Sequence, residues 1–252
     1  MNSLTLLPFA TALCLSWLPG AAYGQDAKQP PAQLRLDSAE DFEMVNGKAE
    51  VVAYRGRRAV HLQPLPGHEA DDGSMLAILK DTAFQDGTIE AEVAGAPRAG
   101  AAPSMKGFIG IAFRVQPHGS PAELFYLRPS NARSPDQLVR NHSVQYVSAP
   151  DFPWQRLRQE TPGVYESYVD LEPGVWTTMR IVVSGTKASL YVNGASQPCL
   201  IVNDLKRGES RGQIALWAHD TTEAYFASVA IQKYACCAVL CCWPILRAES
   251  LR

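Results

Sequence analysis

The chain contains 252 residues, of which 46% are hydrophobic, and its formal net charge is −2. A chain of this size can bury the core of one large all-β domain without relying on disulfides. A charge close to zero gives no positive field to attract nucleic acid or an anionic membrane. We therefore expect no nucleic-acid partner, and we look for function in local groups of side chains.

The N-terminal segment has the pattern of an export signal. An apolar stretch covers residues 4–18, and Ala22-Tyr23-Gly24 provides the small-x-small sequence that precedes a cleavage site. Residues 1–24 are therefore predicted to be a signal peptide, which makes the protein secreted or periplasmic, with no membrane span after cleavage. Residues 25–33 are predicted to be a disordered leader. Because no Lys or Arg precedes the apolar stretch, an uncleaved membrane anchor is the alternative.

The cysteines do not form a disulfide framework. Two adjacent pairs, Cys236-Cys237 and Cys241-Cys242, crowd into a short apolar stretch near the C-terminus. Adjacent cysteines fit one tetrahedral metal ion poorly, and the stretch is too short to span a bilayer. Residues 233–252 are therefore interpreted as a Cys-rich irregular tail outside the fold.

Turn signals between apolar runs predict an all-β fold. Three turn signals, Asn46-Gly47, Arg55-Gly56-Arg57-Arg58 and Asn193-Gly194, each separate two strand-like segments. Asn-Gly between such segments is the strongest short-range hairpin signal, because both residues tolerate a positive φ. No segment keeps helical periodicity over three turns. Residues 94–103, which are rich in Gly, Ala and Pro, are predicted to be a surface loop.

Further strand-like segments follow at short intervals. They cover residues 75–79, 88–93, 108–115, 123–127, 143–147, 165–169, 176–183, 213–218 and 224–232. Roughly a dozen strands are too many for one flat sheet, so two packed antiparallel sheets are expected. We therefore predict one sandwich domain over residues 34–232.

The segment 108–115 is the most informative of these strands. Its odd-numbered residues are apolar and predict the face that packs in the core. Its other face combines Gly110 and Ala112 with Arg114 at the end. Small residues leave a shallow floor, and an arginine beside it can donate to sugar hydroxyls or to a carboxylate. A strand that faces solvent with a surface arginine is the alternative.

The segment 123–131 contains the next candidates. Tyr126 and Arg128 alternate onto one face, where they would form a stacking-plus-donor pair for a pyranose ring, and Asn131 follows them. Glu123 points to the opposite face in the same alternation. A half-buried strand that ends at Pro129 is the structural alternative.

A polar stretch after this strand supplies hydrogen-bonding groups. Arg140 and Gln145 flank His142, which is the most suitable proton-transfer group because its ordinary pKa lies near neutrality. Trp154 lies in a segment that would form an aromatic lip over a groove. A surface histidine and a tryptophan that pins its loop are the alternatives.

Several other chemistries lack their sequence signals. There is no nucleophile elbow, no Gly-rich phosphate loop and no paired-His metal motif. Glu69, Asp71 and Asp72 do not follow the spacing of a known calcium loop, so a calcium site there is only an alternative. We expect no cofactor and no metal centre.

Several segments together resemble a known family. They are Gly110-Ile-Ala-Phe-Arg114, residues 123–129, Val144-Gln-Tyr146, and Pro173-Gly-Val-Trp176 leading to Tyr191-Val-Asn-Gly194. Together they resemble concanavalin A-like sandwich domains, and are most similar to bacterial secreted 3-keto-disaccharide hydrolase domains. The likeness covers roughly residues 34–232. Laminin-G-like binding domains share its Trp…Asn-Gly part, which therefore specifies fold and not activity.

The resemblance implies a jelly-roll sandwich of two antiparallel sheets whose concave face meets a sugar. It places Arg114, Glu123, Arg128 and Gln145 in the groove. An enzyme of this kind would cleave a glycosidic bond, with Glu123 or His142 as the base and an arginine holding the oxyanion. A non-catalytic glycan-binding module and a laminin-G-like protein-interaction domain are the alternatives. In each sugar-directed case the partner is a carbohydrate.

Overall fold

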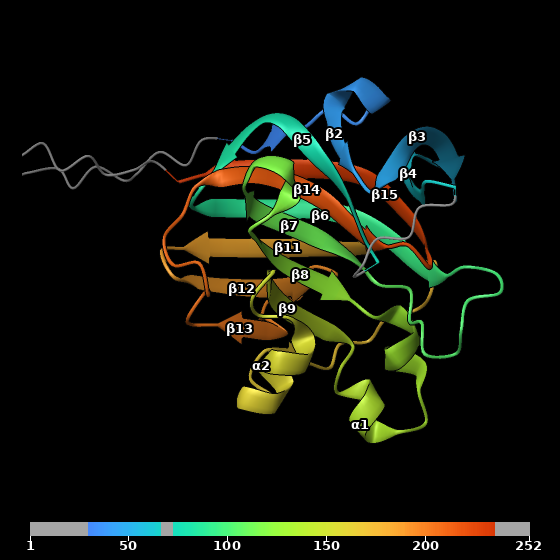
Figure 1. Ribbon diagram of the computed structural model, residues 1–252, viewed down its shortest axis with the longest axis vertical. Coiled ribbons are helices and arrows are strands. Elements are labelled where there is room, and N and C mark those ends of the chain that lie inside the picture. The colour runs from blue at the N-terminus through green and yellow to red at the C-terminus, as the bar shows by residue number, and fades with distance from the viewer. Residues whose placement is uncertain (1–29, 67–72, 235–252) are drawn as a thin grey trace, which may run out of the picture.

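A computed structural model describes residues 30–66 and 73–234 as two antiparallel sheets packed face to face (Figure 1). This confirms the predicted all-β jelly-roll sandwich. The predicted signal peptide, the paired cysteines of the tail and the three acidic residues considered for calcium lie outside the described residues. Within the two described ranges, no helix is long and apolar enough to cross a membrane.

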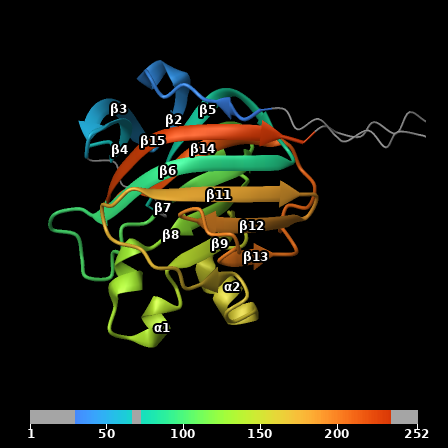
Figure 2. The same cartoon turned by 180° about the vertical axis from the view of Figure 1, so that it is seen from behind.

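Sheet A contains eight strands, and Figure 2 shows it from behind. Its order is β13 (Leu200–Val202), β12 (Lys187–Val192), β11 (Thr177–Ser184), β6 (Gly87–Pro97), β15 (Thr222–Lys233), β4 (Arg57–Pro64) and β3 (Gly47–Tyr54), with β1 (Ala32–Gln33) also paired to β15. Burial alternates along β11, as expected for a strand with one face in the core and one toward solvent.

Sheet B contains seven strands. Its order is β10 (Glu166–Ser167), β9 (Val144–Ala149), β8 (Ala122–Leu127), β7 (Ile109–Val115), β14 (Gly212–His219), β5 (Ser74–Phe84) and β2 (Phe42–Val45). Every residue of β7 and β8 is buried, on the outer face as well as the inner face. The outer face of sheet B is therefore the sheltered face of the sandwich, unlike that of sheet A.

Short helical segments border sheet B. The helices α1 (Gln137–Arg140) and α2 (Trp154–Glu160) lie before and after β9, at the end of the molecule away from β2 (Figure 1). The 3-10 segments are η1 (Ala39–Asp41), η2 (Pro117–Gly119) and η3 (Pro129–Arg133). α2 was not predicted, because its seven residues are too few to show helical periodicity.

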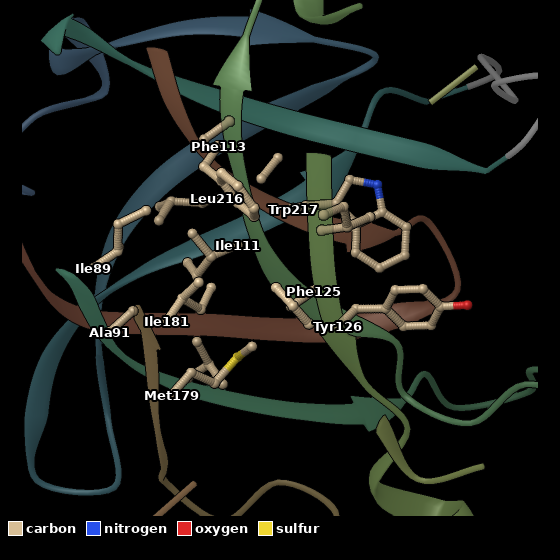
Figure 3. Packing of buried hydrophobic residues seen from close by; sticks show 14 of the residues in the cluster. Ile89, Ala91, Ile111, Phe113, Phe125, Tyr126, Met179, Ile181, Leu216 and Trp217 are labelled. Atoms are coloured by element: carbon tan, nitrogen blue, oxygen red, sulfur yellow. The ribbon is translucent and has the colours of Figure 1, made fainter. Parts of the chain in front are cut away.

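The core lies between the two sheets. Ile89 of β6 and Ile181 of β11 pack toward Ile111 of β7 (Figure 3). Tyr126 and Trp217 lie on the other side of sheet B in the same view, away from these residues. Burial of apolar area between the sheets stabilises the sandwich by about 25 cal/mol per Å² removed from water.

The three predicted hairpin turns have different outcomes. A turn between β3 and β4 is present as predicted, but it consists of Arg55 (φ 45°) and Gly56 (φ 76°) alone, because Arg57 and Arg58 already pair with β3. Asn193-Gly194 begins the loop between the paired strands β12 and β13, as predicted. The hairpin at Asn46-Gly47 is wrong, because β2 pairs in sheet B and β3 pairs in sheet A. The chain crosses between the sheets there, and only Asn46 takes a positive φ, 56°.

Two boundaries also differ from the predictions. Ala32–Gln33, placed in the disordered leader, pairs with Ile231 and Ala230 of β15. The loop predicted at 94–103 begins later, because β6 continues to Pro97 alongside β15. Both segments gain backbone hydrogen bonds from the long strand β15, which composition alone does not reveal.

Arg114 joins several turns at one end of the sandwich. Its side chain is 0% exposed. Nε donates to the Gln85 carbonyl (3.0 Å), Nη1 to that of Gly208 (2.6 Å), and Nη2 to that of Gly185 (2.7 Å) and to Asp86 Oδ1 (3.1 Å). A bulge in the pairing of β7 with β14, with Arg114 at φ 52°, interrupts the simple alternation. The expected position of Arg114 on the sugar-facing surface is therefore wrong.

Replacing Arg114 with Ala should destabilise the fold strongly. The substitution leaves three carbonyls and one carboxylate without their donor, so we expect a loss of about 3 kcal/mol or more in the free energy of unfolding. Urea denaturation measures it, with Arg211→Ala on the surface as the control, expected to stay within about 0.5 kcal/mol. Equal stability of the two variants would contradict the role of Arg114.

Candidate functional site

Strand register aligns one row of side chains across the outer face of sheet B. Trp217 pairs with Gly110, Gly110 with Tyr126, Tyr126 with Gln145, and Gln145 with Glu166. The row therefore runs through five neighbouring strands, from β14 to β10. It brings together residues that lie more than a hundred positions apart in the sequence.

Gly110 leaves the middle of this row without a side chain, so the sheet surface is flat there. We call this surface the floor of the site. A Cβ at this position would meet the Phe125 carbonyl and the backbone of Tyr126, so only glycine fits. On either side of the glycine lie the rings of Tyr126 and Trp217, whose centroids are 5.1 Å apart at 43°. Burial raises the pKa of the Tyr126 phenol, which therefore stays protonated. The floor thus combines two aromatic rings with a fixed hydroxyl.

Arg128 lies beyond Tyr126 on the same face. Its side chain is only 6% exposed. Nη2 donates to the Tyr126 hydroxyl at 2.7 Å, and Nη1 donates to the His142 carbonyl at 3.2 Å. Its guanidinium lies 5.7 Å from the ring centroid of Trp154, which belongs to α2. Arg128 therefore links the floor to the loops that surround it.

Glu166 is the acidic centre of the site. Its side chain is 4% exposed and receives a two-pronged interaction from Arg158 of α2, with Nη2 to Oε2 at 2.6 Å and Nε to Oε1 at 3.0 Å. Nδ1 of His142 lies 2.8 Å from Oε2, which is an ion-pair distance when the imidazole is protonated. Nη1 of Arg128 lies further from Oε2, at 3.8 Å. One carboxylate thus faces two guanidinium groups and an imidazole.

The backbone carbonyl of His142 accepts hydrogen bonds, whereas its imidazole is partly exposed. Asn131 Nδ2 donates to the His142 carbonyl at 3.0 Å, beside the bond from Arg128. Its side chain is 26% exposed, and Nε2 has no hydrogen-bond partner among the described residues. Burial lowers the pKa of His142 below its ordinary value of 6.5; Arg158 and Arg128 act in the same direction and Glu166 opposes them. The imidazole is therefore neutral near pH 7 and able to accept a proton.

Buried polar atoms without partners gather at this site. Within the described residues there are six such side-chain atoms, and three of them belong to Asn131 (Oδ1), His142 (Nδ1) and Gln145 (Oε1). The side-chain nitrogen Nε2 of Gln145 donates to the carbonyls of Tyr146 and Tyr165, whereas its side-chain oxygen Oε1 has no partner among the described residues. Buried polar groups are nearly always hydrogen-bonded in folded proteins. His142 Nδ1 faces Glu166 Oε2 at 2.8 Å, so the unpaired acceptors are the oxygens of Asn131 and Gln145, which suit a ligand rich in hydroxyl groups.

Most of the predicted site residues come together here. Tyr126, Arg128 and Gln145 face the same side of sheet B through their register. Arg140 lies at the rim, where its Nη2 donates to the Tyr168 hydroxyl at 2.9 Å. The remaining predicted residues of the site are Asn131, His142 and Trp154.

Glu123 does not belong to this group. Its carboxylate is fully buried, with Oε2 accepting from the Tyr146 hydroxyl (2.7 Å) and Oε1 from the backbone N–H of Arg207 (2.8 Å). The alternation that turns Tyr126 outward turns Glu123 inward. The expected position of Glu123 in the groove is therefore wrong, and its contacts tie a loop to the core.

Three residues of the site were not assigned from the sequence, although Glu166 was considered as a carboxylate that shares a strand face with Tyr168 and Asp170. Glu166 and Trp217 lay inside predicted strands, and Arg158 closed the segment that was interpreted as an aromatic lip. Glu166 alternates with Tyr165, which was a visible signal that one of the two faces a sheltered surface. Their partnership with His142 depends on the order of the strands, which local patterns do not give.

Comparison with protein-family models then identifies the chain. The model of the 3-keto-alpha-glucoside-1,2-lyase-like domain matches residues 28–232. The chain belongs to this family. It is therefore a carbohydrate-related domain, as its resemblance predicted. A search among curated proteins found no match.

Solved structures agree on the fold. The carbohydrate-binding module CBM66 from Bacillus subtilis superposes with a TM-score of 0.50 at 14% identity, covering 75% of this chain and 93% of that chain. A galectin-like protein of unknown function from Bacillus subtilis gives 0.53 at 13% identity, with 82% and 97% covered. The Ca2+-bound VIP36 exoplasmic/lumenal domain gives 0.50 at 10% identity, with 81% and 87% covered. At these identities the likeness establishes the jelly-roll sandwich.

The described residues do not bring together three or more His, Cys, Asp or Glu side chains that could hold a metal ion. Glu69, Asp71 and Asp72 lie outside that part of the chain, so the calcium alternative there stays untested. The charged and titratable side chains that meet at the site are those of Arg128, His142, Arg158 and Glu166.

Replacing Glu166 with Gln should lower the pKa of His142 further. The carboxylate favours the imidazolium form, so removing its charge leaves burial and the two arginines unopposed. Titration of the imidazole C–H signals by proton NMR measures the shift. Glu160→Gln, at the exposed end of α2, is the control and should leave the titration of His142 unchanged. An unaltered pKa in the Glu166 variant would contradict this geometry.

Proposed function

We propose that this domain cleaves a 3-keto glycoside by elimination on the outer face of sheet B. The observation that carries the proposal is the presence of two unpaired buried acceptor oxygens, Asn131 Oδ1 and Gln145 Oε1, on the face that also holds the imidazole of His142. The family to which the chain belongs supports the choice of substrate.

The site matches the two kinds of surface that a sugar presents. The apolar C–H face of a pyranose packs on aromatic rings, and Trp154, which is 38% exposed, offers such a surface at the edge of the site, with the buried rings of Tyr126 and Trp217 behind it. The hydroxyl groups need acceptors and donors at fixed positions. Oδ1 of Asn131 and Oε1 of Gln145 would accept from them, because neither oxygen has a partner within the described residues.

The reaction needs one base and no change of oxidation state. A carbonyl at C3 acidifies the C–H bond at C2, and Nε2 of His142 would take that proton. The electron pair of the C–H bond becomes the C1=C2 double bond while the C1–O bond to the leaving group breaks. The departing oxygen is then protonated by the imidazolium or by water. Negative charge that develops on the C3 oxygen would be stabilised by the guanidinium groups.

A glycan-binding module is the second candidate. It is favoured by the state of Glu166, whose two oxygens already accept from Arg158. Hydrolysis by the usual mechanism needs two carboxyl groups, one on each side of the scissile bond. Because the site has one engaged carboxylate, hydrolysis is disfavoured, and the choice lies between elimination and binding alone.

We also propose that the protein acts outside the cytoplasm. The proposal rests on the export signal in residues 1–24 and on the small-x-small sequence before Gln25. Fractionation of expressing bacteria, with N-terminal sequencing of the exported protein, tests it. Gln25 at the mature N-terminus would support a cleaved signal, and an intact N-terminus in the membrane fraction would favour the anchor.

Replacing His142 with Gln should abolish turnover of methyl 3-keto-α-glucoside while leaving its binding within a few-fold. Loss of a general base costs at least about 100-fold in rate. Proton NMR follows the loss of the anomeric signal and the appearance of the enol-ketone product. His118→Gln, on a separate turn, is the control. Undiminished turnover by the His142 variant would exclude this base, and binding without turnover by the unaltered protein would favour the binding module.

The value of kcat/KM for this reaction should rise with pH in one step, as a single group on the protein loses its proton. The neutral imidazole is the active form, and burial holds the pKa of His142 below its ordinary 6.5. The half-maximal rate is therefore expected below pH 6.5, in kcat/KM measured from pH 4 to 8. A half-maximal kcat/KM above pH 7 would indicate that a different group is the base.

A further inference from the structure

Arg114 in β7 and Arg128 after β8 are both nearly fully buried, with side chains 0% and 6% exposed, but they differ in the number of hydrogen bonds they make. The guanidinium of Arg114 makes four hydrogen bonds, one of them to a carboxylate. The guanidinium of Arg128 makes two, both to neutral oxygens, those of Tyr126 and His142. A guanidinium has five N–H donors. Arg128 therefore retains unused donors in a nearly dry position.

The charge of Arg128 is also poorly compensated. The carboxylate nearest to it is that of Glu166, at 3.8 Å from Nη1, while Arg158 binds the same carboxylate at 2.6 Å. A buried cation without its own counter-ion is costly, because water no longer solvates it. Arg114, by contrast, has Asp86 at 3.1 Å.

The described part of the site therefore carries a surplus positive charge. The same three ionised side chains act on both Tyr126 and His142, namely Arg128 after β8, Arg158 on α2 and Glu166 on β10. Two cations and one anion leave a net charge of +1, with His142 neutral. The other arginines nearby are engaged elsewhere, Arg140 with Tyr168 and Arg133 with Asp170 and Glu172.

We propose that Arg128 receives an anionic group carried by the sugar, so that the natural substrate is an acidic glycoside. The group would be a carboxylate, as in a uronide, or a sulfate or phosphate ester, because all three accept two parallel N–H bonds from a guanidinium. This inference rests on the proposed function, since it needs a sugar on the outer face of sheet B.

Trp154 supports a charged ligand at this position. Its ring centroid lies 5.7 Å from the guanidinium of Arg128 and 4.7 Å from that of Arg158, and the residue is 38% exposed. The two guanidiniums thus lie near one solvent-accessible ring at the edge of the site. An anion that enters past Trp154 would meet the unused donors of Arg128 and neutralise the surplus charge.

A rival explanation is that the surplus charge serves only the negative charge that develops during elimination. The two explanations differ in the substrate before reaction. If the surplus exists for a permanent anion, an acidic glycoside binds more tightly than a neutral one. If it exists for the developing charge, the two bind alike and only the rate depends on Arg128.

The first test compares three ligands by isothermal titration calorimetry with the full chain carrying His142→Gln, because this variant is expected to bind the sugars without cleaving them. They are methyl 3-keto-α-glucoside, the same sugar with a carboxylate at C6, and the same sugar with a sulfate ester at C6. At least one acidic ligand should bind about tenfold more tightly, and raising NaCl from 20 to 500 mM should reduce that preference. The stronger of the two acidic ligands identifies the anion.

Two variants change the charge of the site in opposite directions. Arg128→Gln should abolish the preference for the acidic ligand, and Glu166→Gln should increase it several-fold. All three changes are made in the His142→Gln chain, and Arg133→Gln, at an exposed arginine of η3, is the matched control that should keep the preference of that chain. Thermal melts show whether each variant is folded, and Glu166→Gln keeps the test informative if Arg128→Gln does not fold.

The outcomes separate this inference from the proposed function. Equal affinity for the neutral and acidic ligands, or a preference that Glu166→Gln leaves unchanged, overturns the inference and leaves the proposed function standing. Failure of all three ligands to bind at millimolar concentration overturns both.

Discussion

The two-residue period of the β-strand decides which side chains of sheet B can meet a ligand. Along β8 it sends Glu123 into the core and Tyr126 to the outer face, and the register with β7 then sets Tyr126 beside Gly110. A shift of pairing by one residue would exchange the two faces. The site therefore depends on a register that the packing of the whole sandwich enforces.

The two-residue period of the strands also explains which features of the fold and the site could be predicted from the sequence. Strands, their faces and the position of Tyr126 follow from local alternation, and so does the inward direction of Glu123, although the family resemblance had placed it in the groove. Arg114 escapes the rule because a bulge with a positive φ redirects its side chain, and no local signal announces such a bulge in a non-glycine residue.

Long-range geometry accounts for the remaining differences. The meeting of His142 with Glu166 depends on β9 pairing with β10, and β10 is only two residues long. Asn46-Gly47 has the composition of a hairpin turn, yet the flanking strands find partners in different sheets. In both cases the decisive quantity is the pairing partner, which turn chemistry and periodicity do not encode.

The bonds of Arg114 also have a consequence for how the molecule opens. Arg114 and Arg128 lie toward opposite ends of the paired strands β7 and β8. The first connects turns from both sheets through four hydrogen bonds, whereas the second is surrounded by short helices and loops. Cooperative unfolding units with few cross-links open at lower free energy than the global transition. We therefore expect the turns joined by Arg114 to open only with the whole fold, and the short helices and loops around Arg128 to open at a lower free energy.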